Sequence, residues 1–433
     1  MHAMPICEEP QTLRLLEIAR AIWQDAGEVT KKSLAERLGM SVSSISRLTD
    51  ELERLGVVIE AGTHPSSGGR RPAVLGINAS LGYTIGLDIG GANTRGIAAD
   101  LNHQLISTVR MPTAQALESP DNLLNLERMV RRTIHAGGLD PHRLLAVGVA
   151  ISGVINTNAG VCRFCPNIRG FNDLPVRDYL QERFGVPVIV DDSVRTAAVA
   201  EHRFGLAKDM PYFLRVAVGV GIGAAIMLNG QIYRGVDGTA GELGHIQVRE
   251  DGERCNCGNR GCLEVLASGP AIVRRAQQSM AEGIQTSLET LVKRGQKLTV
   301  EAIAQAARQG DKMAFYIMNR TGEYLGIAIA TALNLLGVQE VIIGGGVSQA
   351  GPILLDAVER TIRFRVMPAL APKVRVHATA LDDLAAARGA AWLAAEQLFL
   401  PQALARQQSI LDIAGRIQPT HRAPQLPQLL KGA

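Results

Sequence analysis

Four side chains that can bind a soft metal ion lie in one glycine-rich stretch of the sequence, residues 241–264 (GELGHIQVREDGERCNCGNRGCLE). They are His245, Cys255, Cys257 and Cys262. Thiolates and imidazole are the ligands that tetrahedral Zn²⁺ takes, and four protein ligands leave no open position for a catalytic water. Unrelated buried thiols are the alternative, but cysteines this close together near a histidine match the spacing of zinc ligands. The stretch therefore predicts a structural zinc site.

Two carboxylates flank these ligands, Glu242 just before His245 and Glu264 just after Cys262. A zinc-bound imidazole has one ring nitrogen left over, which donates to a nearby acceptor. The metal would fix His245 so that its free N–H and the two carboxylates face a common point. Because carboxylates accept hydrogen bonds and this imidazole donates one, the cluster suits a ligand with several hydroxyl groups, such as a sugar. Two solvated surface glutamates are the plainer alternative.

The same stretch resembles the zinc loop of the ROK family (repressors, uncharacterised reading frames and sugar kinases), whose pattern is G-E-x-G-H…C-x-C-G-x-x-G-C-x-E. The resemblance extends from about residue 84 to about residue 395. It implies an actin-like (ribonuclease H-like) α/β fold with two lobes, and it implies that Glu242, His245 and Glu264 contact a sugar.

From Tyr83 onward, apolar strands alternate with helical segments, and three glycine-rich turns follow such strands. Any one of these turns is typical of a simple strand-to-strand bend. Together, and in this order, they resemble the two phosphate loops and the adenosine motif of the ROK fold. The resemblance implies vestigial or weak nucleotide contacts from Asp88, Gly90, Gly91, Gly219, Gly221, Gly345 and Gly346.

Residues 186–205 indicate a strand that ends at Asp191 and Asp192 and opens into a helix. Kinases of the ROK family show Asn-Asp at this place, and the Asp takes a proton from the sugar hydroxyl. The resemblance therefore makes Asp192 the catalytic base if the protein is a kinase. It also implies sugar contacts from Asp191, Asp192 and, in an upstream loop, Asn167. A plain helix N-cap is the alternative for Asp192.

Residues 12–78 predict a winged helix-turn-helix domain, because two short helices joined by a turn containing glycine precede two strands. Thr30 and Ser41 are expected to cap the two helices, and Gly39 to end the first. A small protein-interaction module is the alternative. ROK repressors carry such a winged domain and ROK kinases lack it. The expected DNA contacts are Ser43, Ser44, Ser46 and Arg47 on the second helix and Arg70 and Arg71 in the wing.

Composition sets the frame for these motifs. The 433-residue chain is 46% hydrophobic and 20% charged, with a net charge of +4, as in ordinary soluble proteins of several domains. Six cysteines without a secretory signal indicate a reducing compartment, and no apolar run is long enough to cross a membrane. We expect a cytoplasmic protein with domains at 12–78 and 83–395, followed by a C-terminal helix and disordered tail at 396–433.

These features together favour a DNA-binding transcriptional regulator, a repressor of sugar uptake or catabolism genes, controlled by a sugar or sugar phosphate in the ROK cleft. Within the family, the chain looks most like repressors of N-acetylglucosamine and glucose uptake. An ATP- and Mg²⁺-dependent sugar kinase with a DNA-binding appendage is disfavoured, because Ala92 and Val220 replace threonines of the kinase phosphate loops. A regulator controlled by a sugar-transport protein is a third possibility. The expected partners are a double-stranded DNA operator and a second copy, as a homodimer or homotetramer.

Overall fold

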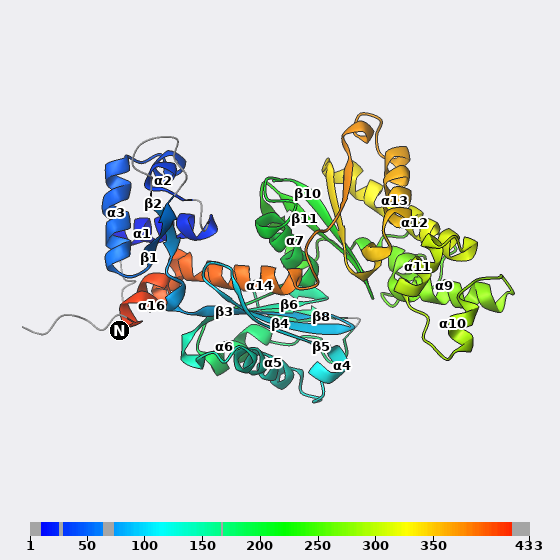
Figure 1. Cartoon of the computed structure of the whole chain (residues 1–433), viewed down its shortest axis with the longest axis horizontal. Helices are drawn as coiled ribbons and strands as arrows, with labels where there is room; N and C mark the ends of the chain where they lie inside the picture. The colour runs from blue at the N-terminus through cyan, green and yellow to red at the C-terminus, as the bar shows by residue number, and fades with distance from the viewer. Residues whose placement is uncertain (1–9, 26–28, 64–72, 166–167, 418–433) are drawn as a thin grey trace, which may run out of the picture.

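The computed structural model describes residues 10–25, 29–63, 73–165 and 168–417 of the chain. Three bodies are visible in Figure 1: an N-terminal domain and two α/β lobes, with one long helix, α14, running from the lobes to the N-terminal domain. Arg70, Arg71 and Asn167, three of the expected contact residues, lie outside the described residues.

The N-terminal domain has the expected helix-turn-helix, followed by a two-stranded antiparallel sheet. Thr30 accepts a hydrogen bond from the Ser33 backbone N–H, Ser41 accepts one from that of Ser44, and Gly39 ends the first helix with a φ of 63°. The predicted caps are therefore confirmed, because a left-handed residue at this position favours glycine. The elements are α1 (Pro10–Gln24), α2 (Lys31–Leu38), α3 (Val42–Arg54), β1 (Val58–Thr63) and β2 (Ala73–Ile77).

The first lobe is built on a five-stranded sheet of order β5-β4-β3-β6-β9, in which β3, β6 and β9 are parallel. Helices α5 and α6 lie on one face of this sheet and α14 lies on the other (Figure 1). The elements are β3 (Tyr83–Ile89), β4 (Asn93–Asp100), β5 (Leu105–Pro112), α4 (Thr113–Ala116), α5 (Asn122–Ala136), β6 (Leu144–Ile151), β7 (Val154–Asn156), β8 (Val161–Phe164), α6 (Val176–Phe184), β9 (Val188–Asp192) and α7 (Ser193–Phe204).

The second lobe contains a matching five-stranded sheet of order β12-β11-β10-β13-β14, with β10, β13 and β14 parallel. Helix α7 packs on β11 of this sheet and also on α14, so it lies between the lobes. The elements are β10 (Phe213–Val218), β11 (Ile222–Leu228), β12 (Gln231–Tyr233), α8 (Leu263–Ala267), α9 (Gly269–Ala281), α10 (Glu289–Lys293), α11 (Val300–Arg308), α12 (Lys312–Leu336), β13 (Glu340–Gly344), α13 (Pro352–Arg365) and β14 (Arg375–Ala378).

The end of the described chain returns to the N-terminal domain. Helices α14 (Ala385–Glu396), α15 (Pro401–Ala405) and α16 (Ile410–Ile417) follow one another, and α16 lies next to the N-terminal domain in Figure 1. The ring of Trp23 in α1 stacks on Trp392 of α14 at 4.0 Å between centroids and on Phe399 at 5.0 Å. All three side chains are buried in one hydrophobic cluster. The N-terminal domain and the C-terminal helices therefore share a core.

The helix-turn-helix and the two α/β lobes agree with the fold class that the sequence predicts. None of the helices in the described part of the chain is both long and apolar enough to span a lipid bilayer.

Candidate functional site

A cleft of about 1360 Å³ lies between the two lobes and brings the separate sequence motifs together. Its volume exceeds that of a typical small-molecule site. Eleven of the expected sugar and nucleotide contacts line it: Asp88, Gly90, Gly91, Asp192, Gly219, Gly221, Glu242, His245, Glu264, Gly345 and Gly346. The glycine-rich turns and the expected sugar contacts therefore face one space.

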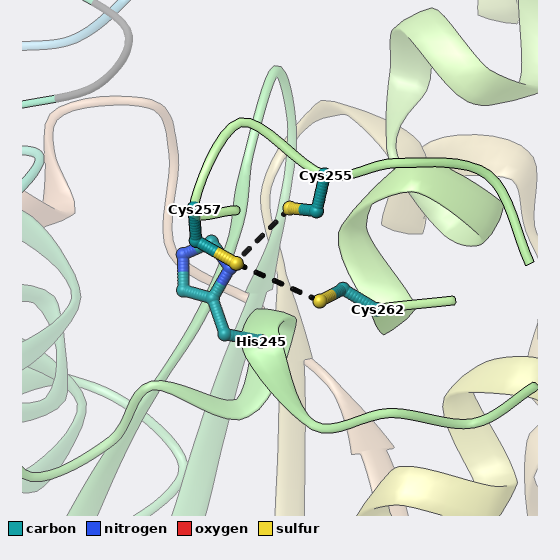
Figure 2. Close-up of side chains that lie close together, drawn as sticks. All are labelled: His245, Cys255, Cys257 and Cys262. Atoms are coloured by element: carbon teal, nitrogen blue, oxygen red, sulfur yellow. Dashed lines mark hydrogen bonds between the residues drawn. The ribbon is translucent and has the colours of Figure 1, made fainter. Parts of the chain in front are cut away.

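Figure 2 shows that the four predicted metal ligands converge on one point. Two of them, His245 and Cys257, line the cleft. Their ligand atoms all lie within 4.8 Å of one another. The Cys257 and Cys262 sulfurs are 3.7 Å apart, and the Cys255 sulfur is 3.7 Å from Nδ1 of His245. Ligands about 2.0–2.3 Å from a tetrahedral Zn²⁺ lie roughly 3.5–3.8 Å from each other. The cluster is therefore consistent with a zinc site.

Glycine is required where this loop folds back on itself. Gly261 has a φ of 64°, and a Cβ added there would lie 1.6 Å from the carbonyl oxygen of Arg249. The backbone N–H of Val248 donates to the carbonyl of Gly261, which joins the two arms of the loop. No side chain fits at this crossing, so the glycine allows Cys262 to come close to the other ligands.

The two ring nitrogens of His245 face different groups. Its Nδ1 faces the cysteines, and its Nε2 lies 3.8 Å from Oε2 of Glu242. Glu264 accepts a hydrogen bond from the backbone N–H of Ile222 at 2.9 Å, which fixes that carboxylate at the edge of β11. With a metal on Nδ1, Nε2 would carry the proton. One N–H donor and two carboxylate acceptors would then line the cleft, an arrangement that can bind several hydroxyl groups.

Asp192 lines the same cleft from the start of α7. Its Oδ1 accepts hydrogen bonds from the backbone N–H groups of Val194 at 2.8 Å and Arg195 at 3.1 Å, so it is the N-cap of the helix. Burial raises the pKa of Asp192 to about 6, although Arg195 opposes the shift. A carboxyl group that titrates near neutral pH is suited to accept a proton from a hydroxyl group.

Asp191 differs from its expected role as a sugar contact. Its side chain is 0% exposed and does not line the cleft. Arg195 Nε donates to Oδ1 at 2.7 Å, and Arg234 Nη2 donates to Oδ2 at 2.8 Å. Because both oxygens are bound to guanidinium groups, Asp191 holds β9 against the loop after β12, and its sugar contact stays a prediction.

Arg95, which lines the cleft together with the glycine-rich turns, was not indicated by the sequence. Its Nη1 donates to Oδ2 of Asp88 at 3.3 Å, and its Nε donates to Asp383 at 2.8 Å. Ser193 donates to the other oxygen of Asp88 at 2.9 Å. The Asp88 carboxylate, expected to face nucleotide, is therefore already bound on both oxygens. Asp383 is too far away in the sequence for any local pattern to indicate the contact.

The outer face of α3 carries the described residues among the expected DNA contacts. Ser43 and Arg47 are exposed, whereas Ser44 and Ser46 are half-buried. The Ser41 hydroxyl donates to the Ser44 hydroxyl at 2.8 Å, so Ser44 takes part in the cap. The placement thus leaves Ser43 and Arg47 as the most accessible of the predicted contacts on α3.

Two family models match the chain: the ROK family over residues 84–397 and a winged helix-turn-helix DNA-binding model over residues 13–59. The chain is 31% identical over 364 residues to the DNA-binding transcriptional dual regulator NagC of Escherichia coli K12, covering 83% of this chain and 87% of NagC. It is 30% identical over 364 residues to the xylose repressor of Bacillus spizizenii W23, covering 83% of this chain and 89% of that repressor.

Solved structures show the same similarity. A ROK family transcriptional regulator, described as a homologue of the E. coli MLC protein, superposes with a TM-score of 0.77 at 25% identity, covering 93% of this chain and 99% of that one. A ROK family glucokinase from Streptomyces griseus, solved with glucose and AMPPNP, superposes with a TM-score of 0.62 at 30% identity. The match covers 72% of this chain and 99% of the glucokinase chain. The glucokinase covers a smaller share of the chain than the regulator does.

Proposed function

The chain belongs to the ROK family and is a DNA-binding transcriptional regulator, and we propose that it represses genes of sugar uptake or catabolism and leaves its operator when a sugar or sugar phosphate binds in the cleft. The observation that carries this proposal is the convergence of Asp192, Glu242, His245 and Glu264 on one cleft. Relatives named for xylose and N-acetylglucosamine support a sugar as the effector.

A bound Zn²⁺ is part of this proposal. His245, Cys255, Cys257 and Cys262 would hold it, and the metal would supply no catalysis because four protein ligands close its coordination. Its effect would be to lock the His245 ring, so that Nε2–H points into the cleft. A fixed donor favours one sugar hydroxyl at a lower entropic cost than a free side chain does.

Two helices give the cleft a direct route to the DNA-binding domain. Helix α7 begins at the Asp192 cap, and at its other end Phe204 lies 5.6 Å from the ring of Trp392. Helix α14 begins where Ala385 lines the cleft and carries Trp392, which stacks on Trp23 of α1. A change in lobe closure would move both helices and therefore reach α1, whose core continues into α3.

A sugar kinase is the competing function, and the similarity to the S. griseus glucokinase favours it. Three features of the cleft oppose it. Ala92 and Val220 offer no hydroxyl group to a nucleotide phosphate, and Arg95 occupies one oxygen of Asp88, so less of that carboxylate remains for a metal–nucleotide complex. Control by a sugar-transport protein and assembly into a homodimer or homotetramer stay predictions from the sequence.

The experiment for this proposal measures DNA binding and sugar binding on the same protein. Genomic fragments are selected with the purified protein, and the selected site is titrated by fluorescence anisotropy. Xylose, N-acetylglucosamine, glucose and their phosphates are then added. We expect sequence-specific binding that one of these compounds reverses. Specific DNA binding that no compound alters, although one of them raises the melting temperature of the protein, would contradict the sensing role.

A further inference from the structure

Arg215 is a buried cation in the cleft that forms no ion pair with any of the described residues. It lies in the middle of β10, where Phe213, Leu214 and Val216 are buried and apolar, and it is itself only 5% exposed. Its Nε is buried and has no hydrogen-bond partner within the described residues. The side chain nevertheless lines the cleft.

The acidic groups around Arg215 do not pair with it. Glu201, Asp192 and Asp88 are near enough to favour its charge. Among the described residues, however, no carboxylate forms an ion pair with it within 4.0 Å. Glu201 accepts hydrogen bonds from the Thr379 hydroxyl and the backbone N–H of Leu206. Burial lowers the pKa of the Arg215 guanidinium. A buried guanidinium without close acceptors is costly unless something else satisfies it.

The position of the guanidinium indicates what would satisfy it. A Cβ built on Gly344 would lie 2.8 Å from Nη2 of Arg215, so the guanidinium reaches the end of β13, next to the turn at Gly345 and Gly346. That turn and the Gly90–Gly91 hairpin both line the cleft. A guanidinium beside glycine-rich turns is a site for a phosphoryl group, because planar N–H donors pair with phosphate oxygens.

We propose that Arg215 is the anion receptor of the cleft, and that the effector is a phosphorylated sugar whose phosphoryl group pairs with Arg215. The sugar ring then lies at the zinc loop, with the phosphate beyond Asp192. This inference rests on the proposed sensing function and narrows it, since the effector is a sugar phosphate and not a neutral sugar. A nucleotide also carries phosphoryl groups that could pair with Arg215, so the test includes both sugar phosphates and a nucleotide.

The test uses isothermal titration calorimetry on the full-length protein with matched pairs: glucose and glucose 6-phosphate, N-acetylglucosamine and its 6-phosphate, and xylose and its 5-phosphate. AMPPNP and inorganic phosphate are further arms. One phosphorylated sugar should bind about tenfold or more tightly than its neutral partner, as a hydrogen bond to a charged group implies. Arg215→Met should abolish that preference, and Arg215→Lys should keep part of it. Arg363→Met is the matched control, because Arg363 lies on the surface of the same lobe, paired with Glu359.

Neutral sugars that bind as tightly as their phosphates would overturn the proposal, and so would an Arg215→Met variant that keeps the preference. If AMPPNP is the only compound whose binding depends on Arg215, the assignment of a sugar phosphate as the effector would be overturned. If Arg215→Met does not fold, the proposal is tested by two other measurements. These are the preference of the parent protein for phosphorylated over neutral sugars, and the same preference in Arg215→Lys. DNA binding is measured on the same samples. Arg215-dependent binding of a sugar phosphate that leaves the operator complex intact would contradict the sensing function but not the anion receptor.

Discussion

Replacing Asp192 by asparagine should stabilise the protein while disabling its response to sugar. Asparagine caps a helix as well as aspartate does, so α7 should keep its start. What changes is the buried charge, because burial raises the pKa of Asp192 to about 6, from an ordinary value of 3.8. Ionising this carboxyl in the folded protein above pH 6 therefore costs on the order of 3 kcal/mol, and Asp192→Asn removes that cost.

The pH dependence has a definite sign. Below pH 3.8 the carboxyl is protonated in both the folded and the unfolded protein, so its titration contributes no difference in stability. As the pH rises towards 6, the unfolded protein loses the proton first, and the stability of the parent falls relative to that of the variant. The stability gain of Asp192→Asn should therefore be full at pH 8 and about half as large at pH 5.

Melting temperatures of parent and variant at pH 5, 6, 7 and 8 measure this gain. Asp121→Asn is the matched control, because Asp121 is an exposed N-cap of α5 that accepts from the N–H groups of Leu123 and Leu124. The control should show no comparable gain at high pH. In the same variant, the operator complex should resist the effector, because a hydrogen bond to the charged carboxylate is lost. A gain that is absent at pH 8, or larger at pH 5, would refute the reasoning.

Three further changes test other parts of the molecule. Cys257→Ser should lower the zinc content, measured by elemental analysis, and reduce sugar affinity, because an incomplete ligand set no longer fixes His245; a parent protein without zinc would contradict the metal assignment. Trp392→Ala should lower the free energy of unfolding by about 3–5 kcal/mol in urea denaturation and weaken the coupling between sugar and DNA binding; unchanged coupling would mean that the signal takes another route. Arg47→Ala should weaken operator binding and flatten its salt dependence, measured by anisotropy, if this exposed guanidinium contacts phosphate; an unchanged salt slope would exclude that contact.

The sequence predicted the features that depend on neighbouring residues. The caps of α2 and α3 depend on residues only a few positions apart, and the predicted zinc ligands also lie close together in the sequence. Features that depend on long-range packing were not predictable in the same way. Asp191 was expected to face a sugar, but Arg234 reaches it from another loop and takes one of its oxygens. The pairing of Arg95 with Asp383 joins β4 to a residue far along the chain.

At short range, two local roles can compete for one side chain. Ser44 was expected to contact DNA, yet its hydroxyl group bonds to that of Ser41 in the helix cap. Arg195 is one turn into α7, but it turns inward to Asp191 and to the carbonyl of Gly238. The hydrogen-bond partner of a polar residue at a helix start therefore cannot be predicted from the local sequence alone, because it depends on where the neighbouring elements lie.

The stack of Trp23 on Trp392 also gives the protein an intrinsic optical probe. The chain contains two tryptophans, and these are the two. One belongs to the DNA-binding domain and the other to the helix that leaves the cleft. All indole emission and the near-ultraviolet circular dichroism of indole therefore originate at this junction. A movement of the DNA-binding domain away from α14 would separate the rings and expose them to water, so it would be recorded in the unlabelled protein, in real time, as a spectral shift.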